Sequence, residues 1–250
     1  MINFFRKIRK QLADDKKPIK YFRYAIGEIV LIVIGILIAL SINNWNQYRI
    51  ERVEEDNYIY RIIEDLKQDT TYLNNKIKET KRNGDSLGLF YKLMHNKQNS
   101  HIDFIRLLQL SNWNPQNVKL QDYTFLEITS SGKFDLIESI ELKENIIDYY
   151  RFRDFTHEHI SETTKNGFDL ITKLLPSLAR YYNYESLMEY EVFGEDDWGW
   201  INNPKDLKFK ELEASISQFR YKANISEDYY KQLYTKAEKI LMLIASIENR

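Results

Sequence analysis

The 250-residue chain contains no cysteine, and this absence removes several kinds of site at once. Disulfide frameworks, thiol nucleophiles and cysteine-bound zinc or iron–sulfur centres are all excluded. Eight glycines and four prolines are few for this length, which favours long helices over many short strands joined by tight turns. The 36 basic and 37 acidic side chains nearly cancel, so the chain lacks the basic excess of a nucleic-acid-binding protein.

Recognisable catalytic and phosphate-binding motifs are also absent from the sequence. It has no phosphate loop, no dinucleotide fingerprint and no Gly-x-Ser-x-Gly elbow. Ser130-Ser131-Gly132 offers two hydroxyl groups, but a helix that stops at the glycine explains the same residues. We therefore predict no catalytic, cofactor-binding or metal-binding residues and no cofactor, and we do not expect an enzyme.

The histidines and the one acidic loop lack the spacing of metal ligands. His157 and His159 would lie about 200° apart on a helix, whereas a helical metal pair shares one face. His95 and His101 flank an expected loop and have no companion acid at useful spacing. Glu195-Asp-Asp197 lacks the alternate-position acids of an EF-hand. His157, His159 and the Glu195–Asp197 cluster are interpreted as solvated surface groups.

The strongest positive signal is an apolar run from Phe22 to Ile42, whose only charged residues are Arg23 near its start and Glu28. As a helix it would rise about 31 Å, which matches a hydrocarbon core of about 30 Å. Ile29–Leu40 is apolar on every face, unlike a helix in a soluble core. A cleaved signal peptide is the alternative, because Ala39-Leu-Ser41 is a small-x-small triplet, but the region before the run is long for one. We predict a retained transmembrane helix over residues 22–42.

The charges that flank this run predict its orientation. Residues 1–23 contain eight Lys and Arg residues, while residues 43–62 contribute only three. By the positive-inside rule the N-terminus is cytoplasmic and the C-terminal domain lies on the far side of the membrane. Residues 1–21 form a basic cytoplasmic tail, either an amphipathic helix on an anionic leaflet or a disordered segment.

Four residues of the run are candidates for helix pairing or an intramembrane role. Glu28 is an acid inside an apolar segment, where desolvation of its charge costs several kcal/mol, yet it lies about one turn from the basic flank. Gly27 and the pair Gly35 and Ala39 would let a second helix approach closely. Self-association through anchor and stalk follows as a hypothesis.

Helical periodicity continues after the anchor. Apolar residues from Ile59 to Ile77 step by three and four, a spacing that also suits a coiled coil, and no proline or glycine interrupts residues 43–83. We predict a stalk helix over 43–83 that ends at Gly84, followed by a helical bundle over 84–250. The fold class is all-α. Helices of the bundle are expected from Leu87, near 102–108, and from Tyr123 with a stop at Gly132. Others are expected after a Ser139 cap, over 160–182 with Pro176 kinking or splitting the helix, and in two closing segments through 212–219 and 233–247.

The one clear long loop, Gly194–Pro204, contains Trp198 and Trp200. Paired tryptophans in a loop can stack on sugars or fill a partner's pocket, so they are candidate interaction residues. They can equally tuck back onto the bundle. The 18 tyrosines favour a binding surface over catalysis.

Several stretches of the chain resemble a known group of proteins. They are the basic start FFRKIRK (4–10), the block YAIGEIVLIVIGILIAL (24–40), the exit NNWN (43–46), and the later segments ITSSGKF (128–134) and IIDYY (146–150). Together they resemble a family of uncharacterised single-pass membrane proteins of Bacteroidetes bacteria, classed as a domain of unknown function. The resemblance implies an inner-membrane protein that faces the periplasm of a Gram-negative cell, and it supplies no catalytic residues.

The leading functional hypothesis is a membrane-anchored helical interaction or scaffold module of the cell envelope. Its expected partners are the lipid bilayer, an envelope protein and a second copy of the chain, but no nucleic acid. One alternative is an envelope enzyme that acts on lipid or cell-wall glycan through carboxylates brought together by folding. A further alternative is a transmembrane sensor that uses a cytoplasmic partner.

Overall fold

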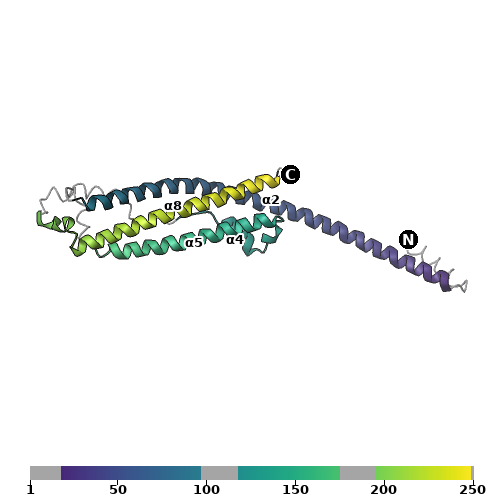
Figure 1. Ribbon diagram of the computed structural model, residues 1–250. Coiled ribbons are helices and arrows are strands. Elements are labelled where there is room, and N and C mark those ends of the chain that lie inside the picture. Colours follow the sequence, from purple (N-terminus) through teal and green to yellow (C-terminus); the bar gives the residue numbers. More distant parts are fainter. Residues whose placement is uncertain (1–17, 97–117, 175–194, 249–250) are drawn as a thin grey trace, which may run out of the picture. The chain divides into compact units, whose positions relative to one another are not determined.

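The computed structural model describes residues 18–96, 118–174 and 195–248 (Figure 1). All regular structure in these ranges is helical, so the predicted all-α class is confirmed. The elements are α2 (Pro18–Met94), α4 (Tyr123–Ser130), the 3-10 helix η1 (Phe134–Leu136), α5 (Ile140–Ile171), the 3-10 helix η2 (Glu195–Asn202) and α8 (Leu207–Glu248). The chain divides into two compact units, Met1–Asn57 and Tyr58–Arg250, and α2 contributes to both.

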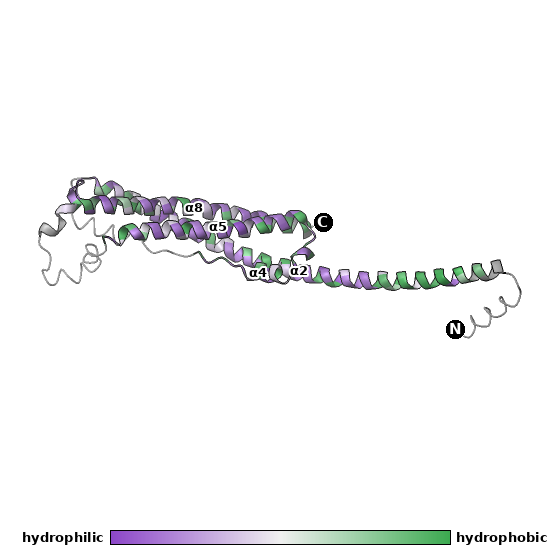
Figure 2. Ribbon diagram, turned by 90° about the horizontal axis from the view of Figure 1, so that it is seen from below, coloured by the Kyte–Doolittle hydropathy of each residue, from purple (hydrophilic) through white to green (hydrophobic). Residues whose placement is uncertain are grey.

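The first unit contains an apolar helical segment whose side chains are exposed. Every residue of α2 from Ile29 to Ile42 is exposed. Figure 2 shows this stretch as an almost unbroken hydrophobic band. Its most apolar 18-residue window has a mean hydropathy of 2.8, and none of that window is buried. Within the described ranges, this is the one helix long and apolar enough to cross a bilayer, which agrees with the predicted anchor.

In the second unit, three long helices enclose the interior. The part of α2 from Tyr58 onward, α5 and α8 lie side by side, with α8 running opposite to the other two (Figures 1 and 2). Each helix buries apolar residues that recur every three or four positions, as in Ile62 and Leu66 of α2. The buried residues form two clusters. Cluster 1 contains Leu87, Phe90, Met94, Ile171, Leu174, Trp200, Ile201, Phe209, Leu212, Ile216 and Phe219. Cluster 2 contains Tyr58, Ile62, Leu66, Leu73, Ile128, Ile137, Leu142, Ile146, Tyr149, Tyr150, Ile160, Tyr230, Leu233, Ala237, Ile240 and Ile244.

Small and polar residues separate the two clusters along the helices. This layer, here called the waist, contains Gly84, Thr163, Thr164, Gly167, Ala223 and Ser226. Thr163 and Thr164 donate their hydroxyl hydrogens to the carbonyls of His159 and Ile160, so these buried polar groups are satisfied within α5. A Cβ at Gly84 would lie 3.4 Å from the Cβ of Ala223, which shows how closely α2 and α8 approach there.

Gly167→Ala is expected to destabilise the second unit by about 1–3 kcal/mol. The new Cβ would lie 3.1 Å from Cζ of Phe219, whose ring is buried in cluster 1 and packs edge-on against Phe168. The matched control is Gly84→Ala, where the new Cβ makes only an ordinary contact and gains about 1 kcal/mol of helix propensity. Urea unfolding monitored by circular dichroism measures both variants. Equal stability of the two would contradict the close packing at Gly167.

The predicted helix stop at Gly132 and the predicted helix cap at Ser139 are both present in the structure. Gly132 follows the end of α4 with a φ of +71°, and the next residue, Lys133, donates its N–H to the carbonyl of Ile128 at 3.0 Å. Ser139 caps α5, because its Oγ accepts the N–H of Leu142 at 3.2 Å. The predicted helix stop and the predicted cap are therefore confirmed.

Several predicted helix ends are wrong. α2 does not end at Gly84 and restart at Leu87 but continues to Met94, so the predicted end of the stalk at 83/84 lies inside a helix. The predicted continuation of the anchor helix into the stalk, across residues 42 and 43, is confirmed. α5 is a single helix over residues that were expected to form two, and α8 likewise replaces the two closing helices. Part of the expected loop 194–204 forms η2. The tail 1–17, the helix near 102–108 and the kink at Pro176 lie outside the described residues.

Candidate functional site

The four anchor candidates lie on the apolar segment of α2. Glu28 is half-buried, whereas Gly27, Gly35 and Ala39 are exposed. A Cβ at either glycine would meet no other atom of the described chain within 4 Å, so both positions have room for a close neighbour. Their role in helix pairing stays a prediction.

Of the two loop tryptophans, Trp200 lies in the interior. Its side chain is 8% exposed and belongs to cluster 1, the cluster at the opposite end of the helices from cluster 2. The side chain of Trp198 lies outside the described residues. Trp200 therefore packs against the bundle, and an interaction role for this loop stays a prediction.

A buried acid, Asp69, joins three parts of the second unit. It lies on α2 and is 1% exposed. Its Oδ1 accepts the backbone N–H of Gln121 at 2.8 Å, and its Oδ2 accepts the hydroxyl of Tyr149 at 2.7 Å. These bonds connect α2 to the segment before α4 and to α5.

The environment of Asp69 favours its protonated form. Removal of the carboxylate from water outweighs the two hydrogen bonds, so the pKa of Asp69 rises to about 6. The neighbouring Asp65 acts in the same direction, while Arg153 opposes the shift. Burial and the nearby Asp69 also raise the pKa of Tyr149, so its hydroxyl remains a donor at all ordinary pH values.

The position of Asp69 in the sequence carries a signal of its burial. Ile62, Leu66, Asp69 and Leu73 step by four, three and four, which places the acid within the buried stripe of α2. An acid in such a stripe needs a donor from a neighbouring element. That donor, Tyr149, is 80 residues away and is not predictable from spacing.

A polar network extends from Asp69 towards the surface. The guanidinium of Arg153 lies 5.1 Å from the centre of the Tyr150 ring, a cation–π arrangement. It forms ion pairs with Asp122 at 3.2 Å and with Asp154 at 2.7 Å. Two buried oxygens here, Oδ2 of Asp65 and the hydroxyl of Tyr150, have no hydrogen-bond partner in the described structure. Burial raises the pKa of Tyr150, and the charges of Asp65 and Asp69 raise it further.

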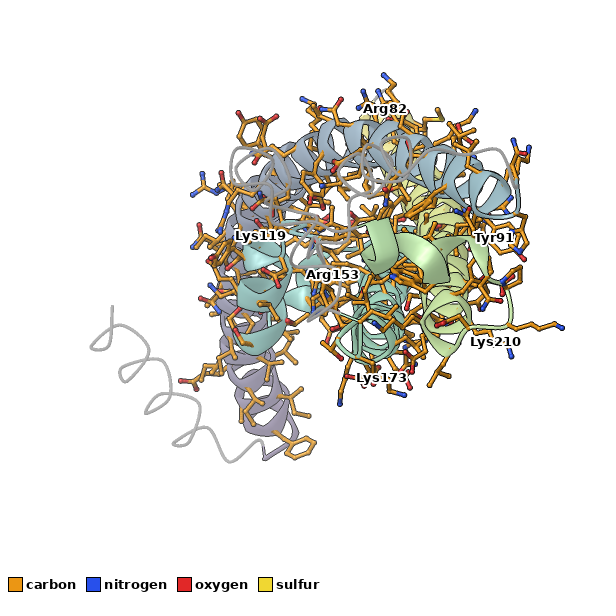
Figure 3. The ribbon with its side chains drawn as sticks, turned by 90° about the vertical axis from the view of Figure 1, so that its left-hand side faces the viewer. Arg82, Tyr91, Lys119, Arg153, Lys173 and Lys210 are labelled. Atoms are coloured by element: carbon orange, nitrogen blue, oxygen red, sulfur yellow. The ribbon has the colours of Figure 1, made fainter. Side chains whose placement is uncertain are left out.

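A cavity of about 210 Å³ lies beside Arg153. In the end-on view, Arg153 lies towards the interior, whereas Arg82, Lys173 and Lys210 lie around the periphery (Figure 3). The segment before α4, up to its N-cap Asp122, one turn of α5 and one residue of α8 form the walls. The lining residues are Val118, Leu120, Asp122, Arg153, Asp154, Thr156, His157 and Leu233.

Two histidines gain partners that their local sequence does not supply. Nε2 of His95 lies 3.0 Å from Oε1 of Glu213, and the hydroxyl of Tyr91 donates to the same oxygen at 3.1 Å. Nδ1 of His159 lies 2.9 Å from the hydroxyl of Tyr229. No acid accompanies His95 at useful sequence spacing, but α8 brings Glu213 to it from 118 residues away. No group of three or more His, Asp or Glu side chains within the described ranges is arranged to hold a metal ion.

Part of the chain matches a known protein family. Residues 28–151 match DUF6090, a family of unknown function. The DUF6090 match includes Asp65, Asp69, Asp122 and Tyr149, and it ends two residues before Arg153. The predicted relationship to a domain of unknown function is confirmed at this level. No curated protein and no solved structure matches the chain.

Proposed function

We propose that the protein is a membrane-anchored helical interaction module of the bacterial cell envelope. The helix over residues 22–42 would lie in the inner membrane, with the N-terminus in the cytoplasm and the helical bundle in the periplasm. The observation that carries this proposal is the fully exposed apolar segment of α2, which would be costly to leave in water. The excess of basic residues before the segment supports the orientation.

The surface of the second unit supports binding as the activity. Tyr123 and Leu126 of α4, together with Ile140 of α5, are large apolar residues that are 77%, 51% and 69% exposed. Among them, an exposed tyrosine such as Tyr123 is a typical anchor of protein interfaces. The carboxylates of Asp122 and Asp154 share one cavity, but each is paired with Arg153, an arrangement that favours binding over acid–base catalysis.

The test uses the full-length protein with a reporter fused after Arg250 that is active only outside the cytoplasm. We expect reporter activity together with recovery of the protein in the inner-membrane fraction. Chemical crosslinking of the same intact cells, followed by mass analysis, is expected to give adducts of defined mass with an envelope protein or a second copy. An inactive reporter would reverse the proposed orientation, and recovery of the monomer alone would contradict the interaction module.

A further inference from the structure

We propose that the cavity beside Arg153 is a binding site for a small organic cation, an alkylammonium ion with a short apolar chain. The proposal rests on the charges, the unsatisfied hydroxyl group and the apolar wall of this cavity. It does not depend on the membrane topology.

The charges of the cavity favour a cation. Its walls hold two carboxylates, Asp122 and Asp154, against the single guanidinium of Arg153. Arg153 contacts Oδ2 of Asp122 and Oδ1 of Asp154, which leaves the second oxygen of each carboxylate for the N–H groups of a ligand. The acids of α2 add negative potential to this region, because Asp69 interacts with the charge of Arg153, and Asp65 and Asp69 both act on Tyr150.

Thr156 is the second, independent observation. It lines the cavity and is 1% exposed, and its Oγ1 has no hydrogen-bond partner in the described structure. Thr163 and Thr164 of the same helix satisfy their hydroxyls on the carbonyl four residues earlier, but Thr156 does not. A buried hydroxyl without a partner costs about 1–3 kcal/mol, so such a group points to a ligand that supplies the missing hydrogen bond.

The remaining walls suit the hydrocarbon part of an alkylammonium ion. Val118 and Leu120 line one side and Leu233 of α8 lines another, so an apolar chain would leave water on binding. An organic anion would meet Arg153 only in competition with Asp122 and Asp154, which already hold it. The cavity thus combines hydrogen-bond acceptors with an apolar wall.

The experiment is ligand-observed saturation-transfer NMR on the full-length protein in lipid nanodiscs. The probe is n-butylammonium chloride, with 1-butanol as the uncharged control, sodium butyrate as the anionic control, and sodium chloride to match ionic strength. We expect saturable binding of butylammonium, binding of butanol at least about tenfold weaker, and no saturation with butyrate. Saturation by butyrate, or by none of the probes, would overturn the proposal.

Two variants and one matched control locate the binding site. Asp154→Asn removes an exposed charge without altering the core, and Thr156→Val replaces the hydroxyl with a methyl group of similar size. Each is expected to weaken butylammonium binding about fivefold or more. Asp148→Asn is the control, because Asp148 lies on the same helix but pairs with Lys236 away from the cavity. Unchanged affinity in Asp154→Asn, or an equal loss in Asp148→Asn, would show that the amine binds elsewhere.

Discussion

Asp69→Asn is expected to remove most of the change in stability that the protein shows between pH 4 and pH 7. The folded-state pKa of Asp69 is about 6, against 3.8 for a free aspartate side chain. Between these values the folded state binds more protons than the unfolded state, so the free energy of unfolding falls as the pH rises. The contribution is fully present below about pH 4 and is lost above about pH 6. A shift of about two pKa units corresponds to roughly 3 kcal/mol.

The measurement is urea unfolding of the wild-type protein and the variant at pH 4.5 and pH 7.5. The wild-type protein should be less stable at the higher pH, and this difference should nearly vanish in Asp69→Asn. Asp148→Asn, at an exposed site on α5, is expected to keep the wild-type pH dependence. Tyr149→Phe should make the dependence steeper, because it removes the hydroxyl that stabilises the ionised carboxylate. The same pH dependence in wild type and Asp69→Asn would contradict the buried acid.

Ile34→Arg combined with Leu37→Arg is expected to shift the protein from the membrane fraction to the soluble or aggregated fraction. Both positions lie in the middle of the apolar segment of α2 and are exposed. An arginine at the centre of a membrane helix costs about 2.5–3.5 kcal/mol, so the pair disfavours insertion by roughly 6 kcal/mol. Alkaline extraction of membranes followed by immunoblotting measures the retained fraction.

The matched control for this pair is Ile50→Arg combined with Val53→Arg. These residues are also exposed apolar positions of α2, but they lie beyond the predicted membrane segment. The control protein should remain in the membrane fraction after alkaline extraction. Membrane retention of both double variants would argue that the apolar segment is not an anchor.

The features that could be predicted from the sequence depend on short-range signals. The apolar length of 22–42, the left-handed glycine Gly132 and the capping hydroxyl of Ser139 each act within a few residues, so local patterns are sufficient. The helix ends were predicted less well for a physical reason. At the waist the buried positions hold Thr, Ser, Ala and Gly, and their low hydrophobicity resembles the end of an amphipathic stripe. The helices continue past these positions because tertiary packing against the neighbouring helices stabilises them.

The candidate site was largely beyond prediction because its parts are far apart in the chain. Asp69 and Tyr149 are separated by 80 residues, and Leu233 closes the cavity from the last helix. Sequence spacing reveals which residues share a helical face, but not which faces meet. The position of Asp69 inside the stripe of Ile62, Leu66 and Leu73 was the one available clue.

The waist has a consequence for how the bundle moves. α2, α5 and α8 each contribute large side chains to both clusters, but the fully buried positions between the clusters hold small side chains such as Thr163, Gly167 and Ala223. Little apolar surface is buried at that level, so loosening one end of the bundle need not disturb the other. We therefore expect the backbone amides of a single helix to exchange with solvent at two distinct rates, one for each end of the bundle.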